Sequence, residues 1–224
     1  RKDIIKMEQS EVKQKIEQGK VIVISRKIYG ETLLGIARAL YKGGVRMMEV
    51  TFDQADPECI KKTPDAIAML RKELPDDMMC GAGTVLNEAQ VTAAANAGAL
   101  YMISPNVNER VIRFTKEKGL VSIPGAMTPS EILSAADYGA DFIKIFPFSD
   151  LGMGYIKSIR GPINHLKLIA TGGVTQDNFD EALSGGFTGA GVGGYLANRA
   201  LAEQGKFDEL TKRAEIFTQI ASKH

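Results

Sequence analysis

The chain has 224 residues, 44% of them hydrophobic, and its 28 basic and 27 acidic residues give a formal net charge of +1. This balance, without any basic block, argues against a protein that binds nucleic acid or an anionic membrane surface. The longest apolar runs, such as residues 21–24, are far shorter than the roughly 20 residues that a membrane-spanning helix needs.

Cysteine and histidine usage narrows the chemistry further. Cys59 and Cys80 are too few for a disulfide framework, and with His165 and His224 as the only histidines no Cys/His zinc cluster can be assembled. Histidine-based acid–base catalysis is nearly excluded as well. Residues 1–20 alternate charge with isolated apolar residues and contain no apolar signal-peptide core, so a cytoplasmic protein is expected.

One theme recurs along the chain: a helical stretch, then glycine, then a short apolar run that ends in a small or polar residue. Eight such runs are present, and their spacing leaves room for a loop and a helix between successive runs, as parallel strands require. The runs are Val21 to Ser25, Val45 to Thr51, Met78 to Gly83, Leu100 to Ser104, Leu120 to Pro124, Asp141 to Phe146, Lys167 to Thr171 and Phe187 to Gly191.

Helix signals lie between these runs. Thr128 suits an N-cap and Glu131 completes a capping box, while Asn87 marks another helix start. Since no linker or change of composition divides the chain, we expect one domain over residues 1–224: a (β/α)8 TIM barrel with an extra N-terminal helix from Ile4 to Gln18. An open doubly wound sheet is the alternative, but eight units in this length favour closure.

In such a barrel the active site is built at the carboxyl ends of the strands. Alternation places Lys144 on the same strand face as Phe142 and Phe146, where burial would lower the pKa of the amine and let it attack a carbonyl. The other interpretation is a lysine that reaches out from the strand end to a surface carboxylate.

Glu49 shares a strand face with Met47 and Thr51, an inward position where a carboxylate is costly unless it is hydrogen-bonded or takes part in a reaction. Alternatively, it forms an ion pair with Lys144 or Arg26. Arg26 directly follows the first run and could bind a substrate carboxylate, although that residue alone fits a surface arginine equally well.

Two glycine-rich stretches, residues 170–174 and 191–194, follow the seventh and eighth runs, where barrels commonly bind phosphate. Glycine allows backbone N–H groups to approach an anion closely. Two such turns at these positions predict a phosphate site. The Gly-x-Gly turn at residues 81–83 is a weaker signal, because it lacks the rest of a dinucleotide-binding fingerprint.

Taken in order, these segments resemble the class I 2-keto-3-deoxy-6-phosphogluconate (KDPG) / 4-hydroxy-2-oxoglutarate (KHG) aldolase family from Val21 to Leu196. Each segment is weak alone, but the ordered set is highly specific. It consists of Gly43-Gly44-Val45 with Glu49-Val50-Thr51, Gly81-Ala82-Gly83-Thr84-Val85, Ile103-Ser104-Pro105, Pro124-Gly125 with Thr128-Pro129-Ser130-Glu131, Lys144-Ile145-Phe146-Pro147, Thr171-Gly172-Gly173 and Gly191-Val192-Gly193.

The resemblance implies a homotrimeric barrel that uses neither metal nor cofactor and cleaves a small 2-keto acid through a lysine Schiff base. Lys144 matches the Schiff-base lysine and Glu49 the proton-transfer carboxylate. The positions that match substrate contacts are Arg26, Thr84 and Pro105 around the pyruvate moiety, Phe146 beside the lysine, and Thr171, Gly172, Gly173, Gly193 and Gly194 toward the phosphate end. The implied reactions yield pyruvate with glyceraldehyde 3-phosphate from KDPG, or pyruvate with glyoxylate from KHG.

Several positions depart from the family pattern and leave the exact substrate open. Where many members carry Arg four residues after the catalytic Glu, this chain has Asp53, and Gly194 stands where many carry Ser. Asn106 replaces a common Gly, and Phe148-Ser149 replace a small residue followed by Glu. An aldolase for another 2-keto-3-deoxy acid, such as the phosphogalactonate isomer, therefore remains an alternative. A non-catalytic sugar-phosphate sensor has no reason to keep both Lys144 and Glu49, and a metal-dependent epimerase is disfavoured by the shortage of histidines.

Overall fold

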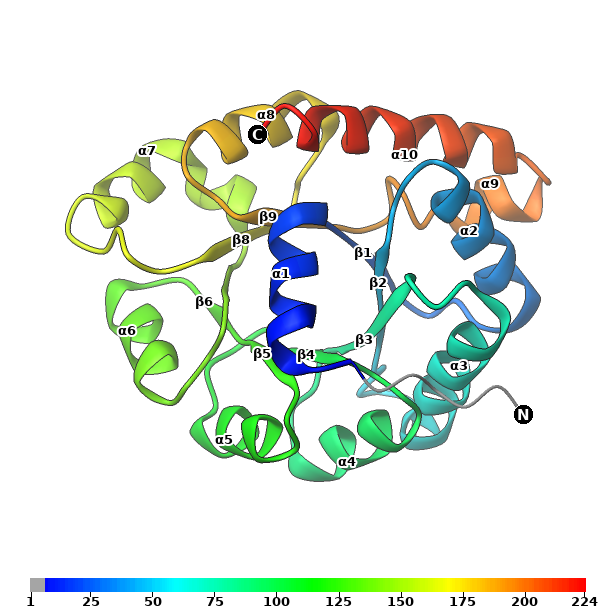
Figure 1. The fold of residues 1–224 in the computed structure, drawn as a ribbon, viewed down its shortest axis with the longest axis horizontal. Helices are drawn as coiled ribbons and strands as arrows, with labels where there is room; N and C mark the ends of the chain where they lie inside the picture. The colour runs from blue at the N-terminus through cyan, green and yellow to red at the C-terminus, as the bar shows by residue number, and fades with distance from the viewer. Residues whose placement is uncertain (1–6) are drawn as a thin grey trace.

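The computed structural model describes residues 7–224, in which the chain forms nine strands and ten helices. Figure 1 shows the strands as a central ring with helices around it. The strands are β1 (Val21–Ser25), β2 (Met47–Thr51), β3 (Met79–Gly83), β4 (Tyr101–Ile103), β5 (Val121–Ile123), β6 (Gly125–Ala126), β7 (Ile143–Ile145), β8 (Leu168–Thr171) and β9 (Gly189–Val192). The helices are α1 (Gln9–Gly19), α2 (Gly30–Lys42), α3 (Cys59–Glu73), α4 (Glu88–Asn96), α5 (Glu109–Glu117), α6 (Pro129–Asp137), α7 (Phe148–Arg160), α8 (Gln176–Ser184), α9 (Arg199–Glu203) and α10 (Phe207–Ala221).

All strand pairs are parallel, in the order β5-β4-β3-β2-β1-β9-β8-β7-β6. The two ends of this order, β5 and β6, are separated in the chain only by Pro124. Proline has no N–H to donate, but its carbonyl accepts a hydrogen bond from the Lys144 N–H at 2.9 Å. The nine strands therefore occupy eight positions around a ring, which confirms the predicted (β/α)8 barrel over the open sheet.

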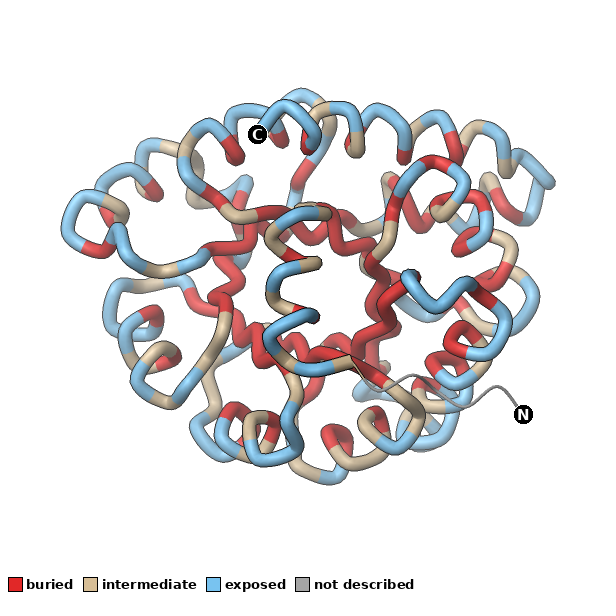
Figure 2. The backbone as a smooth tube through the Cα atoms, viewed as in Figure 1, coloured by how far each residue is buried: buried red, intermediate tan, exposed pale blue. Residues whose placement is uncertain are grey.

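Each predicted run contains a strand, although most strands are one to three residues shorter at one or both ends than the run. The first run, Val21–Ser25, matches its strand at both ends. The last strand instead extends to Val192, one residue past its predicted end. The fifth run contains only β5, which ends before Pro124, and a further short strand beyond the run, β6, pairs with β7. In Figure 2 the strands form a buried ring, and the helices turn their exposed sides outward.

Helix α1 lies across one end of the ring (Figure 1), which is the amino-terminal end, because α1 leads directly into β1. Its buried residues, Val12 and Ile16, pack into the apolar cluster that fills the barrel interior. The other members of this cluster are Ile22, Met47, Met79, Leu100, Tyr101, Ile103, Val121, Ile123, Phe142 and Ile169. The helix and the interior side chains thus close this end of the barrel, which leaves the carboxyl ends of the strands for a site.

The predicted N-terminal helix from Ile4 to Gln18 is corrected at both ends. Residues 4–6 lie outside the described part of the chain, residues 7 and 8 are not helical, and the helix runs from Gln9 to Gly19. The start is hard to see in the sequence because the N-cap, Glu8, makes no capping side-chain hydrogen bond. The predicted starts of α4 and α6 are confirmed, with Asn87 as N-cap and a complete capping box at Thr128 and Glu131. No helix within residues 7–224 has the length and apolarity needed to cross a bilayer.

Candidate active site

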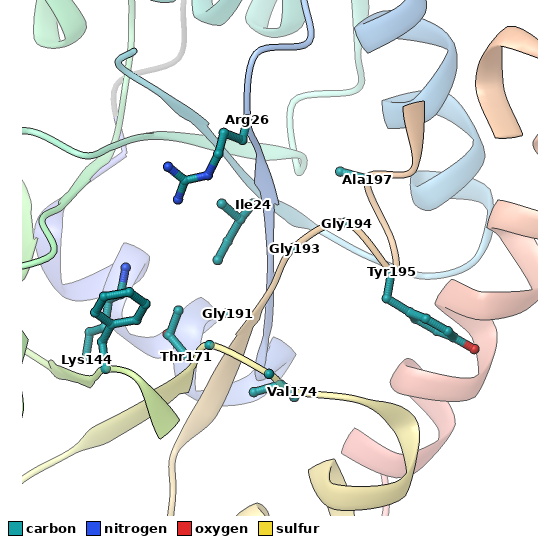
Figure 3. A pocket seen from close by; sticks show the side chains of 13 residues that line it. Ile24, Arg26, Lys144, Thr171, Val174, Gly191, Gly193, Gly194, Tyr195 and Ala197 are labelled. Carbon is teal, nitrogen blue, oxygen red and sulfur yellow. The ribbon is translucent and has the colours of Figure 1, made fainter. Parts of the chain in front are cut away.

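A cavity of about 460 Å³ opens at the carboxyl ends of β1, β7, β8 and β9. Figure 3 shows Lys144 on one wall and Arg26 at the end of β1, with the nitrogen atoms of both side chains extending into the same space. The lining residues are Ile24, Arg26, Lys144, Phe146, Thr171, Gly172, Gly173, Val174, Gly191, Gly193, Gly194, Tyr195 and Ala197.

Lys144 is the central residue of β7 and is only 8% exposed. Its Nζ lies 4.9 Å from the ring centroid of Phe146, which is also part of the cavity wall. Burial lowers the pKa of the Lys144 amine, and the nearby charge of Arg26 lowers it further, whereas Glu49 acts in the opposite direction. As the alternation predicted, Phe142 lies below Lys144 in the barrel interior. Lys144 forms no ion pair with another residue in the described range, so it is not a lysine reaching for a surface carboxylate.

Glu49 on β2 is 1% exposed, and its Oε2 atom has no hydrogen-bond partner among the described residues. Burial raises the pKa of this carboxyl from 4.5 to about 7, despite the opposing effect of the positive charges of Lys144 and Arg26. Gly83 on the neighbouring strand makes room for the side chain, because a Cβ there would lie 2.4 Å from Glu49 Oε2. A buried carboxyl that titrates near neutral pH is suited to accept a proton and return it.

The two residues lie on opposite sides of the barrel, since β2 and β7 are equally far apart in both directions around the ring. They interact electrostatically without a direct ion pair within 4.0 Å, among the groups that the structure describes. Burial shifts each group toward its neutral form, and the attraction between the two opposes that shift. The arrangement places a buried amine and a buried carboxyl on opposite sides of the barrel interior.

The cavity gathers most, but not all, of the predicted site residues. Glu49, Thr84 and Pro105 are not among the residues that line it. Glu49 is linked to the site by its electrostatic interactions with Lys144 and Arg26. Thr84 follows β3 with a φ of 55°, and the carbonyl of Pro105 packs so closely on Gly125 that a Cβ there would lie 2.5 Å from it.

The two glycine-rich turns line the same side of the cavity. Gly172 and Gly173 both have left-handed backbones, with φ of 93° and 71°, and two residues separate them from the start of α8. The N–H groups of Gly172, Gly173, Gly193 and Gly194 donate no hydrogen bond to another residue in the range 7–224. Four free N–H groups beside one cavity can hold an anion.

Sequence reasoning missed several lining side chains, among them Ile24 and Tyr195. Ile24 belongs to β1 and looks like any other strand residue in the sequence. Figure 3 shows the Tyr195 ring pointing away from Lys144, and its hydroxyl donates to Gln176 Oε1 at 3.1 Å. The only sequence signal for Tyr195 is its position directly after the Gly193–Gly194 turn.

Comparison with known proteins gives consistent matches over most of the chain. The family model described as KDPG and KHG aldolase matches residues 12–213. A probable 2-dehydro-3-deoxy-6-phosphogalactonate aldolase of Rhizobium meliloti is 37% identical, over 79% of this chain and 81% of its own. The KHG/KDPG aldolase of Escherichia coli is 34% identical, over 86% and 87%.

Solved structures show the same architecture. The KDPG aldolase of Legionella pneumophila, captured with pyruvate as a covalent carbinolamine intermediate, superposes with a TM-score of 0.80 at 26% identity and covers 92% of this chain and 97% of its own. The match of the family model over most of the chain agrees with the two sequence relatives. The chain therefore belongs to the KDPG and KHG aldolase family and is a carbon–carbon lyase.

Proposed function

We propose that this protein is a class I aldolase in which Lys144 forms a Schiff base with the C2 ketone of a 2-keto-3-deoxy acid. The observation that carries the proposal is the buried, unpaired Lys144 opposite the buried, unpaired Glu49 Oε2. The Legionella pneumophila relative, with pyruvate held as a covalent carbinolamine, supports the same chemistry here. The substrates proposed are KDPG, KHG or both.

The steps follow from the two neutral groups. The Lys144 amine attacks C2, and the protonated Glu49 carboxyl, directly or through a water, donates a proton to the carbinolamine hydroxyl. The hydroxyl leaves as water, so that a protonated imine and the Glu49 carboxylate remain. The Glu49 carboxylate, directly or through a water, takes the proton of the C4 hydroxyl. The C3–C4 bond then breaks, its electrons pass into the imine to form an enamine, and the aldehyde leaves. Glu49 returns the proton to C3, and water hydrolyses the protonated imine to release pyruvate, the free lysine and a proton that the Glu49 carboxylate takes up.

The remaining contacts fix the two ends of the substrate. Arg26 would hold the carboxylate, with Thr84 and Pro105 around the pyruvate moiety and Phe146 against the imine. The free N–H groups of the two glycine turns would bind the distal phosphate. The reaction needs no separate cofactor, because the protonated imine is itself the electron sink.

A specific observation favours the phosphogalactonate isomer as a second candidate substrate, since the Rhizobium meliloti relative carries that name. The non-catalytic sensor is less well supported, because binding alone gives no reason to bury a lysine and a glutamate without partners. The family resemblance further leads us to propose a homotrimer of single-domain chains in the cytoplasm.

Borohydride reduction in the presence of pyruvate tests the proposal, with peptide mass mapping to locate the reduced adduct. We expect the label on Lys144 and on no other lysine, because a lowered pKa supplies free amine near neutral pH. Label on Lys157 or Lys167 with Lys144 unmodified would refute the assignment. Comparing the rates of KDPG, its C4 epimer and KHG then distinguishes the substrates.

A further inference from the structure

Two residues with strained backbones lie on either side of the end of β2, at the mouth of the barrel. Lys27, with a φ of 56°, follows β1, and Thr84, with a φ of 55°, follows β3. These are the two strands that pair with β2. Residues other than glycine rarely adopt this conformation, and it persists only where surrounding contacts hold it. Both positions concern the proposed substrate, because Arg26 directly precedes Lys27 and Thr84 is itself a proposed contact.

Two consecutive residues of the loop after β2 contact the two strained residues. The Asp53 carboxylate lies 3.1 Å from Lys27 Nζ, and Gln54 Nε2 donates to the Thr84 carbonyl at 2.8 Å. Gln54 is fixed in turn by Gln90, whose Nε2 donates to Gln54 Oε1 at 2.9 Å.

Gln90 itself is anchored. It is 4% exposed, and its Oε1 accepts a hydrogen bond from the Leu86 N–H at 2.7 Å. The chain of hydrogen bonds therefore starts and ends in the loop after β3, with Gln54 as the link to the loop after β2. A side chain held at both ends in this way can fix the backbone of Thr84.

We propose that Asp53 and Gln54 are positioning residues for the carboxylate end of the substrate. Asp53 holds the left-handed Lys27 and thereby directs Arg26 into the cavity, while Gln54 holds the Thr84 backbone. This inference rests on the proposed function for the roles of Arg26 and Thr84. It also assigns a structural role to Asp53, although the negative charge of Asp53 repels a substrate carboxylate.

Because Asp53 is negatively charged, a positioning role can be distinguished from a direct effect of its charge on the substrate. If Asp53 acted only through its charge, its removal would strengthen the binding of an anionic substrate. If it acts by positioning Arg26, its removal weakens that binding instead. The neutral analogue methyl pyruvate has the same ketone but no carboxylate, so it reports on Lys144 without Arg26.

The experiment measures the concentration of pyruvate, or of methyl pyruvate, that gives half-maximal borohydride trapping. It compares wild type with Asp53→Asn, Asp53→Glu and Gln54→Leu. Loss of the Asp53–Lys27 ion pair, which is exposed at its lysine end, should raise the half-saturating pyruvate concentration about 2- to 5-fold in Asp53→Asn. Loss of the Gln54 hydrogen bond should raise it about 3- to 10-fold in Gln54→Leu, and methyl pyruvate should be unchanged in both variants. Asp53→Glu should restore part of the loss because it keeps the charge. Glu58→Gln is the matched control, since Glu58 lies in the same loop and pairs with Lys62 instead.

A double variant tests the route through Arg26. In an Arg26→Ala background, Asp53→Asn should have no further effect on pyruvate, because coupled residues are not additive. Equal loss for both ketones, tighter pyruvate binding in Asp53→Asn, or full additivity with Arg26→Ala would each overturn the inference. Those results would leave the proposed function standing, whereas a wild-type protein that pyruvate and borohydride do not label at all would refute the function itself.

Discussion

A lysine and a glutamate face each other at both ends of this barrel, with opposite results. At the amino-terminal end, Lys167 and Glu17 form an ion pair at 2.5 Å, with side chains 50% and 36% exposed. At the carboxyl end, Lys144 and Glu49 are both buried and form no such pair within the described chain. Exposure decides the difference, because water stabilises the charges of the first pair and is withheld from the second.

This difference between the two ends shows that apolar packing closes one end of the barrel, whereas the reactive groups gather at the other. Helix α1 closes the amino-terminal end with apolar contacts, and Glu17 on that helix can meet Lys167 at the surface. The carboxyl end has no such cover, and its inward lysine and glutamate have pKa values displaced toward each other. The predictions below compare matched substitutions at the two ends.

The largest effect should come from the two lysines. Lys144→Arg should abolish turnover, because a guanidinium stays protonated and cannot form an imine. Lys167→Arg keeps a cation beside Glu17. Because exposed ion pairs contribute little energy, kcat should stay within about twofold of wild type. Steady-state aldol cleavage, coupled to detection of pyruvate, measures both. Full activity in Lys144→Arg would remove the Schiff base from the mechanism.

The two glutamates should differ next. Glu49→Gln should still form the imine, but slowly, and should lose roughly 10²- to 10⁴-fold in proton exchange at C3 of pyruvate, the usual contribution of a general acid–base. Glu17→Gln is the control and should exchange at the wild-type rate. Deuterium incorporation followed by NMR measures the rates. Unchanged exchange in Glu49→Gln would assign the proton transfer to another group.

Stability should depend on pH through Glu49. Its pKa is about 7 in the folded protein against an ordinary 4.5, so the folded state retains a proton that the unfolded chain releases between these values. The contribution of the Glu49 carboxyl to the stability of the fold is complete below about pH 4.5 and is lost as the pH rises through about 7. Glu49→Gln cannot lose a proton, so its free energy of unfolding relative to wild type should rise by about 2 to 3 kcal/mol from pH 5 to pH 8.

Urea unfolding at several pH values measures this difference. Glu17→Gln serves again as the control, since an exposed pair contributes below about 1 kcal/mol. A Glu49→Gln difference that stays constant from pH 5 to pH 8 would show that Glu49 is charged throughout the range, held by Lys144 and Arg26.

The sequence predicts most of the barrel because each apolar run and helix start is a local signal, as at Asn87 and Thr128. It also places Lys144 and Glu49 on inward faces. It does not reveal that Pro124 splits a strand, or which loop residues meet, because Gln54 and Thr84 come together only when β2 and β3 pair. Contacts of this kind depend on tertiary geometry and leave no periodic pattern.

The smallest effect concerns the phosphate end of the cavity, where Gly194 offers only its backbone. We expect the phosphorylated substrate to have a higher kcat/KM than KHG, but by a modest margin. Gly194→Ser should widen that margin about 10- to 150-fold by improving the phosphorylated substrate alone, the worth of one charge-assisted hydrogen bond. The site has room, because nothing lies within 4 Å of a Cβ at Gly194.

Gly154→Ser is the matched control for this change, because a Cβ there is equally free and the residue lies on α7, outside the cavity lining. It should leave both substrates unchanged. If wild type cleaves the two substrates equally and Gly194→Ser alters neither, the glycine turns do not bind phosphate. The protein would then act on unphosphorylated hydroxy-oxo acids, and the carboxyl end of the barrel would recognise its substrate through Arg26 and the imine alone.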